Sequence, residues 1–183
     1  MVRVAIALLL LTACATTTPA PPAPPPATKP APWNANPPAA APRVLLDEWA
    51  KAENRATCAP LTFATLREDG TVRRANFSGG WAVAWDIPGL PGREATGHHC
   101  ATCGRGVFGI AGAGVTVGED TPGFPEFEQY EGENWAGWHL EGGSGPNWLA
   151  QVRVDDQQCL YYVWSFLGRD HVAELVRSIR RVR

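Results

Sequence analysis

The sequence predicts an α+β domain: an antiparallel sheet of about five to seven strands, with an N-terminal helix and a C-terminal amphipathic helix packed on it. Three observations predict this class. Apolar residues recur at helical spacing after residue 43 and again at the C-terminus, several segments between them alternate along a strand, and glycine-rich turns separate these segments. Strands grouped between two helices are typical of the α+β class.

The first predicted element is a helix over residues 43–57, where Leu45, Trp49 and Ala52 recur at helical spacing. Strands are predicted next, because side chains on a strand point alternately to the two faces of a sheet. The predicted strands span residues 71–77, 81–86, 106–117, 135–140, 147–154 and 159–166.

The last predicted element is an amphipathic helix. One apolar stripe at helical spacing contains Val172, Leu175, Val176, Ile179 and Val182. Acidic residues precede arginines along this segment, which is the order that the helix dipole favours. We expect the stripe to pack on the sheet and the arginines to face water.

Composition excludes several classes of protein. The chain has 183 residues, 45% of them hydrophobic, with a net charge of −2. This balance argues against disorder of the whole chain and against a nucleic-acid partner, which calls for a basic excess. Gly112-Ala113-Gly114 lacks the third glycine and the helix of a dinucleotide-binding motif, so we expect no cofactor.

The N-terminus has the layout of a secretory signal over residues 1–13, with Arg3 followed by an apolar run that is too short to span a bilayer. The following Leu11-Thr12-Ala13-Cys14 resembles the lipobox of bacterial lipoproteins. The resemblance implies cleavage before Cys14, acylation of that cysteine and a membrane partner through this lipid anchor. Because Ala15 rather than aspartate follows, the resemblance favours the outer membrane, with the domain facing the periplasm.

Residues 14–42 are predicted to be the lipidated cysteine and a disordered Pro/Ala-rich stalk. Residues 15–42 hold 11 of the 17 prolines, and consecutive prolines favour an extended chain without a core. Residues 43–183 are then a single globular domain. Trp33 is the unusual residue of the stalk. The sequence does not decide between two alternatives, docking of this side chain on the domain and its exposure to solvent.

Four cysteines follow Cys14: Cys58, Cys100, Cys103 and Cys159. An even number in an exported chain indicates disulfides, and four cysteines allow three pairings. We favour Cys100–Cys103 together with Cys58–Cys159.

The segment His98-His99-Cys100-Ala101-Thr102-Cys103 also permits two other chemistries. A redox dithiol needs a group that stabilises the thiolate, commonly a helix N-terminus, and no helical pattern follows Cys103. A metal site would use the two thiolates with His98 or His99. The structural disulfide is the favoured interpretation, and the redox and metal interpretations remain alternatives.

No catalytic residue is predicted. Trp135, Trp138 and His139, near several carboxylates, form a weak binding candidate of the kind found in sugar-binding clefts. The leading hypothesis is a lipid-anchored, non-catalytic binding or structural module of the cell envelope, with an unidentified envelope or cell-wall partner. The alternatives are a periplasmic thiol-redox or metal-binding protein, and a cell-wall glycan binder or hydrolase.

Overall fold

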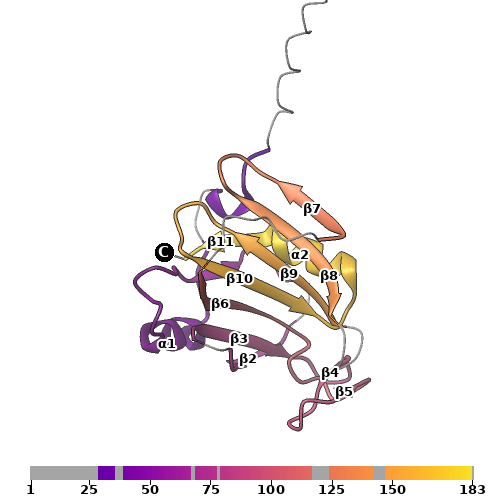
Figure 1. Cartoon of the computed structure of the whole chain (residues 1–183). Coiled ribbons are helices and arrows are strands. Elements are labelled where there is room, and N and C mark those ends of the chain that lie inside the picture. The colour runs from indigo at the N-terminus through magenta and orange to yellow at the C-terminus, as the bar shows by residue number, and fades with distance from the viewer. Residues whose placement is uncertain are drawn as a thin grey trace, which may run out of the picture.

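The computed structural model describes residues 29–35, 39–66, 69–77, 79–116, 124–141 and 147–182. The α+β class is confirmed, because the described residues form a seven-stranded antiparallel sheet and two α-helices (Figure 1). The strands of this sheet are β2 (Thr71–Arg74), β3 (Trp81–Asp86), β6 (Phe108–Thr116), β7 (Glu126–Gln129), β8 (Trp135–Glu141), β9 (Asn147–Arg153) and β10 (Cys159–Ser165). Their order is β2-β3-β6-β10-β9-β8-β7, which places β10 in the middle.

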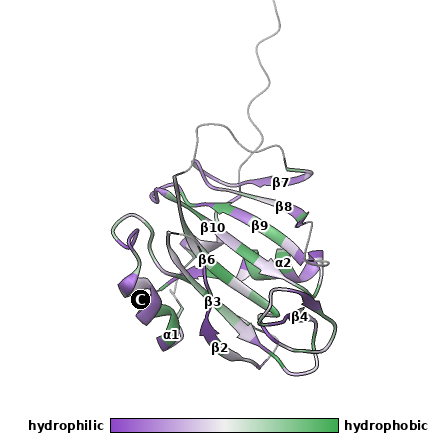
Figure 2. Cartoon of the chain, turned by 60° about the horizontal axis from the view of Figure 1, so that its bottom comes forward, coloured by the Kyte–Doolittle hydropathy of each residue, from purple (hydrophilic) through white to green (hydrophobic). Residues whose placement is uncertain are grey.

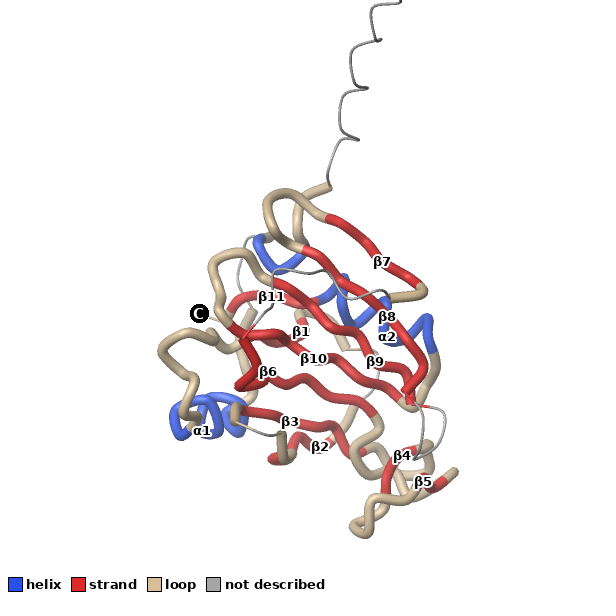
Figure 3. The backbone as a smooth tube through the Cα atoms, viewed as in Figure 1, coloured by secondary structure: helices blue, strands red, loops and turns tan. Residues whose placement is uncertain are grey.

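Shorter elements complete the fold (Figure 3). These are the 3-10 helix η1 (Pro32–Asn34), the helices α1 (Arg43–Lys51) and α2 (Arg169–Ser178), and the strands β1 (Leu61–Phe63), β4 (Gly92–Arg93), β5 (His99–Cys100) and β11 (Ile179–Arg181). Strand β1 pairs with β11, and β4 pairs with β5. Neither described α-helix has the length and apolar character needed to cross a bilayer.

Both α-helices pack on the sheet, α1 against β2 and β3 and α2 against β8, β9 and β10. The alternation predicted for residues 81–86 is present, because Trp81, Val83 and Trp85 all enter the core. Tyr161 and Val163 enter the same core from β10. Figure 2 shows strongly hydrophobic residues interspersed with less hydrophobic ones along the central strands. Each large apolar side chain buried here contributes about 1.5–3 kcal/mol.

Both predicted helices end earlier than their apolar patterns. Helix α1 ends at Lys51, and turns follow, in which the Asn54 side chain donates to the carbonyls of Gly112 and Ala113. Helix α2 ends at Ser178, and residues 179–181 form strand β11 instead of a last helical turn. Ile179 is buried in this extended backbone, and its segment gains backbone hydrogen bonds to β1.

The predicted Cys58–Cys159 disulfide is confirmed, with the two Cα atoms 5.5 Å apart. It joins the segment after α1 to the first residue of β10 across a sequence separation of 101. In the chain-entropy model, closing a loop of this length lowers the conformational entropy of the unfolded state and thereby raises its free energy by about 4.7 kcal/mol. The bond therefore holds the segment after α1 against the central strand.

Trp33 docks on the domain, which settles the question that the sequence leaves open. The side chain is 0% exposed, and the edge of its indole meets the Tyr130 ring at 5.2 Å between centroids. Its Nε1–H donates to Asn134 Oδ1 at 2.9 Å. Ala31 is buried with it, and both belong to the main hydrophobic core.

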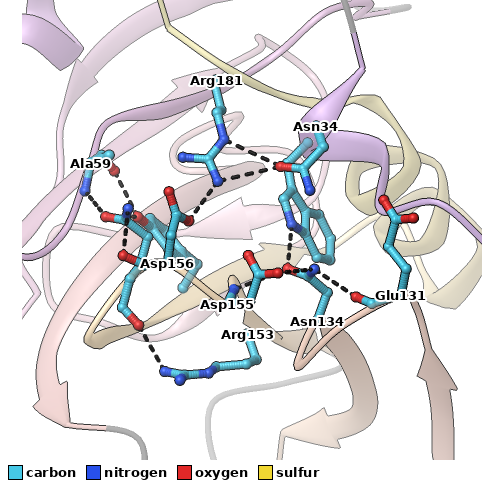
Figure 4. A network of polar contacts seen from close by, with 11 residues as sticks. Asn34, Ala59, Glu131, Asn134, Arg153, Asp155, Asp156 and Arg181 are labelled. Atoms are coloured by element: carbon cyan, nitrogen blue, oxygen red, sulfur yellow. Dashed lines mark hydrogen bonds and ion pairs between the residues drawn. The ribbon is translucent and has the colours of Figure 1, made fainter.

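A polar network holds this docked segment (Figure 4). The buried Asn134 donates to the Glu131 carbonyl and to Asp155, and its Oδ1 also accepts the Asp155 N–H. Arg181 of β11 donates to Asn34 and Asp156. The carboxamide of Asn134 thus uses both donors and its acceptor, which removes the cost of burying it.

The part of the chain that packs in the core therefore begins before residue 43, the expected domain start. A stalk of prolines and alanines has no core of its own, but one tryptophan is enough to seat residues 29–35 on the sheet. Residues 1–28, including the signal segment and Cys14, lie outside the described residues.

A chain that begins at Arg43 should be less stable than one that begins at Lys29 by about 3–5 kcal/mol, because loss of a buried tryptophan costs about that much. Urea denaturation measures the difference. Trp33→Ala in the full chain should lose a similar amount. Pro30→Ala, at an exposed position, is the control and should change stability by less than about 0.5 kcal/mol. Equal stability of the two chains would show that the docked segment contributes nothing.

Candidate functional site

The face of the sheet opposite α1 and α2 has a depression, because large and small residues alternate across it. We call this the open face. One cross-strand row on it runs through Ala84 of β3, Gly109 of β6, Trp164 of β10 and Leu149 of β9. A side chain at Gly109 would overlap the Trp164 ring, so glycine is required for the indole to lie across β6. The small residues leave room above β3 and β6.

A pocket of about 370 Å³ occupies this region. Leu149, Tyr162 and Trp164 line it from the central strands. The segment after β2 and the β4–β5 hairpin contribute the remaining walls, including Phe77, Arg93 and Glu94. The volume lies within the range of about 300–1,000 Å³ that is typical of small-ligand sites.

Aromatic rings dominate the apolar lining. The Phe77 ring lies 4.9 Å from the Tyr162 ring and 6.3 Å from the Trp164 ring, between centroids, and is inclined to the latter by only 21°. All three side chains are partly exposed. Partial burial raises the pKa of the Tyr162 hydroxyl, so this group stays protonated and can donate a hydrogen bond at neutral pH.

Charged groups of both signs surround the rings. Arg73 Nε donates to both carboxylate oxygens of Asp86 at 2.8 Å, and Asp86 also accepts the Gly106 N–H. The Arg93 guanidinium lies 3.8 Å from Glu141 and over the Phe166 ring. The short hydrogen bonds to Asp86 hold the Arg73 guanidinium in place.

Asn147, at the start of β9, is a buried polar group that lines the pocket and is only half satisfied. It is 3% exposed, and its Nδ2 donates to Glu141 at 2.5 Å. Its Oδ1 is buried without a hydrogen-bond partner in the described part of the protein. An unpaired buried acceptor costs roughly 1–3 kcal/mol. This oxygen has almost no accessible surface, so it does not face the pocket as a free acceptor.

The expected Cys100–Cys103 disulfide is not formed in this structure, where both residues are free thiols. The Cys103 N–H donates to Cys100 Sγ at 2.9 Å, and the Cys103 thiol also lies 3.9 Å from the Cys100 carbonyl oxygen. Gly104 follows with a φ of +63°, and its N–H donates to the Leu90 carbonyl. The tight loop expected around these cysteines is therefore present without the bond.

The two thiols differ in acidity. Hydrogen bonds from the Cys103 thiol and from the Thr102 backbone lower the pKa of Cys100. Desolvation raises the pKa of Cys103. Cys100 is thus the better nucleophile of the pair at neutral pH, although no helix follows the motif to stabilise its thiolate further.

The described residues do not form the alternative metal site. No cluster of three or more potential ligands occurs among the described residues, which include His98, His99, Cys100 and Cys103. The His99 ring instead packs near the Phe166 ring, at 5.7 Å between centroids.

Trp135, Trp138 and His139, the binding candidate expected from sequence, do not form one surface. Trp138 is 2% exposed and belongs to the core. Trp135 is 5% exposed and packs against Phe127. The two tryptophans are three residues apart on β8 and point to opposite faces of the sheet, which excludes a shared platform.

The sequence does not identify the pocket residues as a site. Tyr162 and Trp164 lie in the strand predicted for residues 159–166, and Arg93 and Asn147 lie in separate segments. A possible signal is that residues 159–166 are apolar on both faces, which indicates a strand with more apolar surface than one core can cover.

Alkylation of the native protein without reductant should label Cys100 and Cys103 and leave the bonded Cys58 and Cys159 unlabelled. Because its pKa is lowered, Cys100 should react faster than Cys103 at neutral pH, and its reaction should persist to lower pH. Mass spectrometry after digestion measures both rates. Labelling that requires reductant would indicate a Cys100–Cys103 disulfide, and labelling that requires a chelator would indicate a metal.

The chain matches no protein-family model, and neither curated proteins nor solved structures show significant similarity to it. Evidence on its function therefore comes from its own residues. The two strongest features are the pocket on the open face and the segment Leu11-Thr12-Ala13-Cys14.

Proposed function

We propose that this protein is a lipid-anchored, non-catalytic binding module of the bacterial cell envelope, held to the outer membrane through Cys14, with its domain in the periplasm. The pocket on the open face carries the binding part of this proposal, because it combines aromatic walls with a small number of polar and charged side chains. The lipobox resemblance supports the anchor.

The docked Trp33 gives the module a defined orientation. Strand β8 begins beside Asn134, the partner of Trp33, and ends at Glu141, which lines the pocket. The six steps from Trp135 to Glu141 span about 20 Å. In Figure 1, β7 lies at one end of the molecule and the β4–β5 hairpin at the other. The anchor thus enters at the end remote from the pocket.

This arrangement limits how far the pocket reaches from the membrane. Only residues 14–29 join the proposed anchor to the first docked residue, a distance of at most about 50 Å when fully extended. The domain therefore stays close to the lipid surface while its pocket faces the space beyond it, where a cell-wall or envelope ligand is accessible.

Cys14→Ser tests the anchor. The substituted protein should move from the membrane fraction to the soluble envelope fraction, because without acyl chains nothing in the described residues is long and apolar enough to span a bilayer. Fractionation followed by immunodetection measures the shift. Ala15→Ser is the matched control and should leave the protein in the membrane fraction. Retention of the Cys14→Ser protein would place the anchor elsewhere.

Replacing each of two exposed alanines by tryptophan tests the pocket. Ala95 lines the pocket, whereas Ala101 is also exposed but does not line it. The full chain carrying Cys14→Ser should co-sediment with isolated envelope fragments. Ala95→Trp should reduce this binding by filling the pocket, and Ala101→Trp should not. Equal binding by the two variants would exclude the pocket as the binding site.

The free thiols favour a second candidate function, thiol–disulfide exchange. The Cys100 thiolate would attack a disulfide of a partner protein, forming a mixed disulfide and releasing one partner thiolate. The Cys103 thiolate would then attack Cys100 Sγ, releasing the second partner thiolate, so that the partner is reduced and a Cys100–Cys103 disulfide forms. The contact between the Cys103 N–H and Cys100 Sγ supports this candidate, and the labelling experiment above tests its first requirement.

A further inference from the structure

We propose that the ligand of the pocket is a saccharide of the cell-wall glycan, an inference that rests on the proposed binding function and specifies its ligand. Aromatic rings, charged groups of both signs and the partly exposed Tyr162 hydroxyl occur together there. Together they point to a ligand that has apolar C–H faces and many hydroxyl groups.

The aromatic part suits the faces of sugar rings. Pyranose rings present axial C–H groups on one face, and these pack on the negatively charged face of an aromatic ring. The Phe77 ring lies against the Tyr162 and Trp164 rings at one side of the pocket, and each of the three side chains retains exposed surface. They offer an apolar platform that is not closed off by the described residues.

The polar part suits hydroxyl groups better than a single charge. Arg73, Arg93 and Arg105 line the pocket together with Glu94 and Glu141. Arg73 is already paired with Asp86. An anion would meet the two carboxylates, and a cation would meet the guanidinium groups. A hydroxyl group donates and accepts at the same time, so a saccharide can use donors and acceptors that lie side by side.

The Tyr162 hydroxyl supplies the most specific observation. It lines the pocket, is partly exposed and makes no hydrogen bond within the described residues. A hydroxyl that can both donate and accept is thus available beside the rings, and an acetylated amino sugar offers an N–H, a carbonyl and hydroxyls to pair with it.

Calorimetric titration of the full chain carrying Cys14→Ser tests the proposal, with oligomers of N-acetylglucosamine and soluble peptidoglycan fragments as probes. We expect saturable binding of both. Phe77→Leu should weaken it about two- to tenfold, whereas Phe77→Tyr should preserve it, because an aromatic face and not merely apolar volume is needed. Tyr162→Phe should weaken binding by up to about tenfold through loss of one hydrogen bond.

Phe127→Leu is the matched control, since Phe127 is an exposed phenylalanine that does not line the pocket. It should bind as the unchanged protein does. Thermal unfolding of each variant shows whether a loss of binding reflects loss of folding. No binding of either saccharide probe, or equal effects of Phe77→Leu and Phe127→Leu, would overturn the proposal.

The failure of this inference differs from the failure of the proposed function. Envelope binding that is blocked by Ala95→Trp but not competed by either saccharide would retain the binding module and reject the saccharide. Competition by peptidoglycan stem peptides without sugar would also reject it. If the Cys14→Ser protein binds the saccharides but stays in the membrane fraction, only the proposed anchor is rejected.

Discussion

Strand β10 has apolar side chains on both faces of the sheet, and the arrangement of the other elements depends on how each face is covered. Tyr161 and Val163 point to the side that α2 packs on, and this side becomes the main core. Tyr162 and Trp164 point to the open face, where neighbouring strands provide small residues and no described α-helix packs. Large aromatic groups beside glycine and alanine leave a concave surface, so the pocket is a direct consequence of this two-sided central strand.

The same core determines how the domain is joined to its N-terminal segment. Trp33 inserts between elements that are more than 90 residues away in sequence and makes a hydrogen bond to the fully buried Asn134. A proline-rich segment loses little conformational entropy when it docks, because its backbone is already restricted. One buried tryptophan therefore suffices to change a free tether into a fixed attachment at the end of the molecule remote from the pocket.

The β4–β5 hairpin contributes to both candidate sites of the protein. One strand supplies Arg93 to the pocket, and the other carries Cys100, whose pKa is lowered by its neighbours in the loop. A change in the bonding state of Cys100 and Cys103 would act on the strand that pairs with Arg93. The proposed ligand binding and the candidate thiol exchange thus involve adjacent parts of one structural element.

Local patterns in the sequence determined the α+β class and the strands around Trp81 and Trp164, because alternation and helical spacing are properties of neighbouring residues. The number and spacing of the cysteines determined the preference for a Cys58–Cys159 pair. Tertiary structure decided the rest. Ile179 is buried in either a helix or a strand, so its periodicity could not distinguish the end of α2 from β11. The burial of Trp33, the separation of Trp135 from Trp138 and the assembly of Phe77, Asn147 and Trp164 into one pocket depend on the order and register of strands that are distant in sequence. These contacts follow from packing across the whole sheet, and no short stretch of residues encodes them.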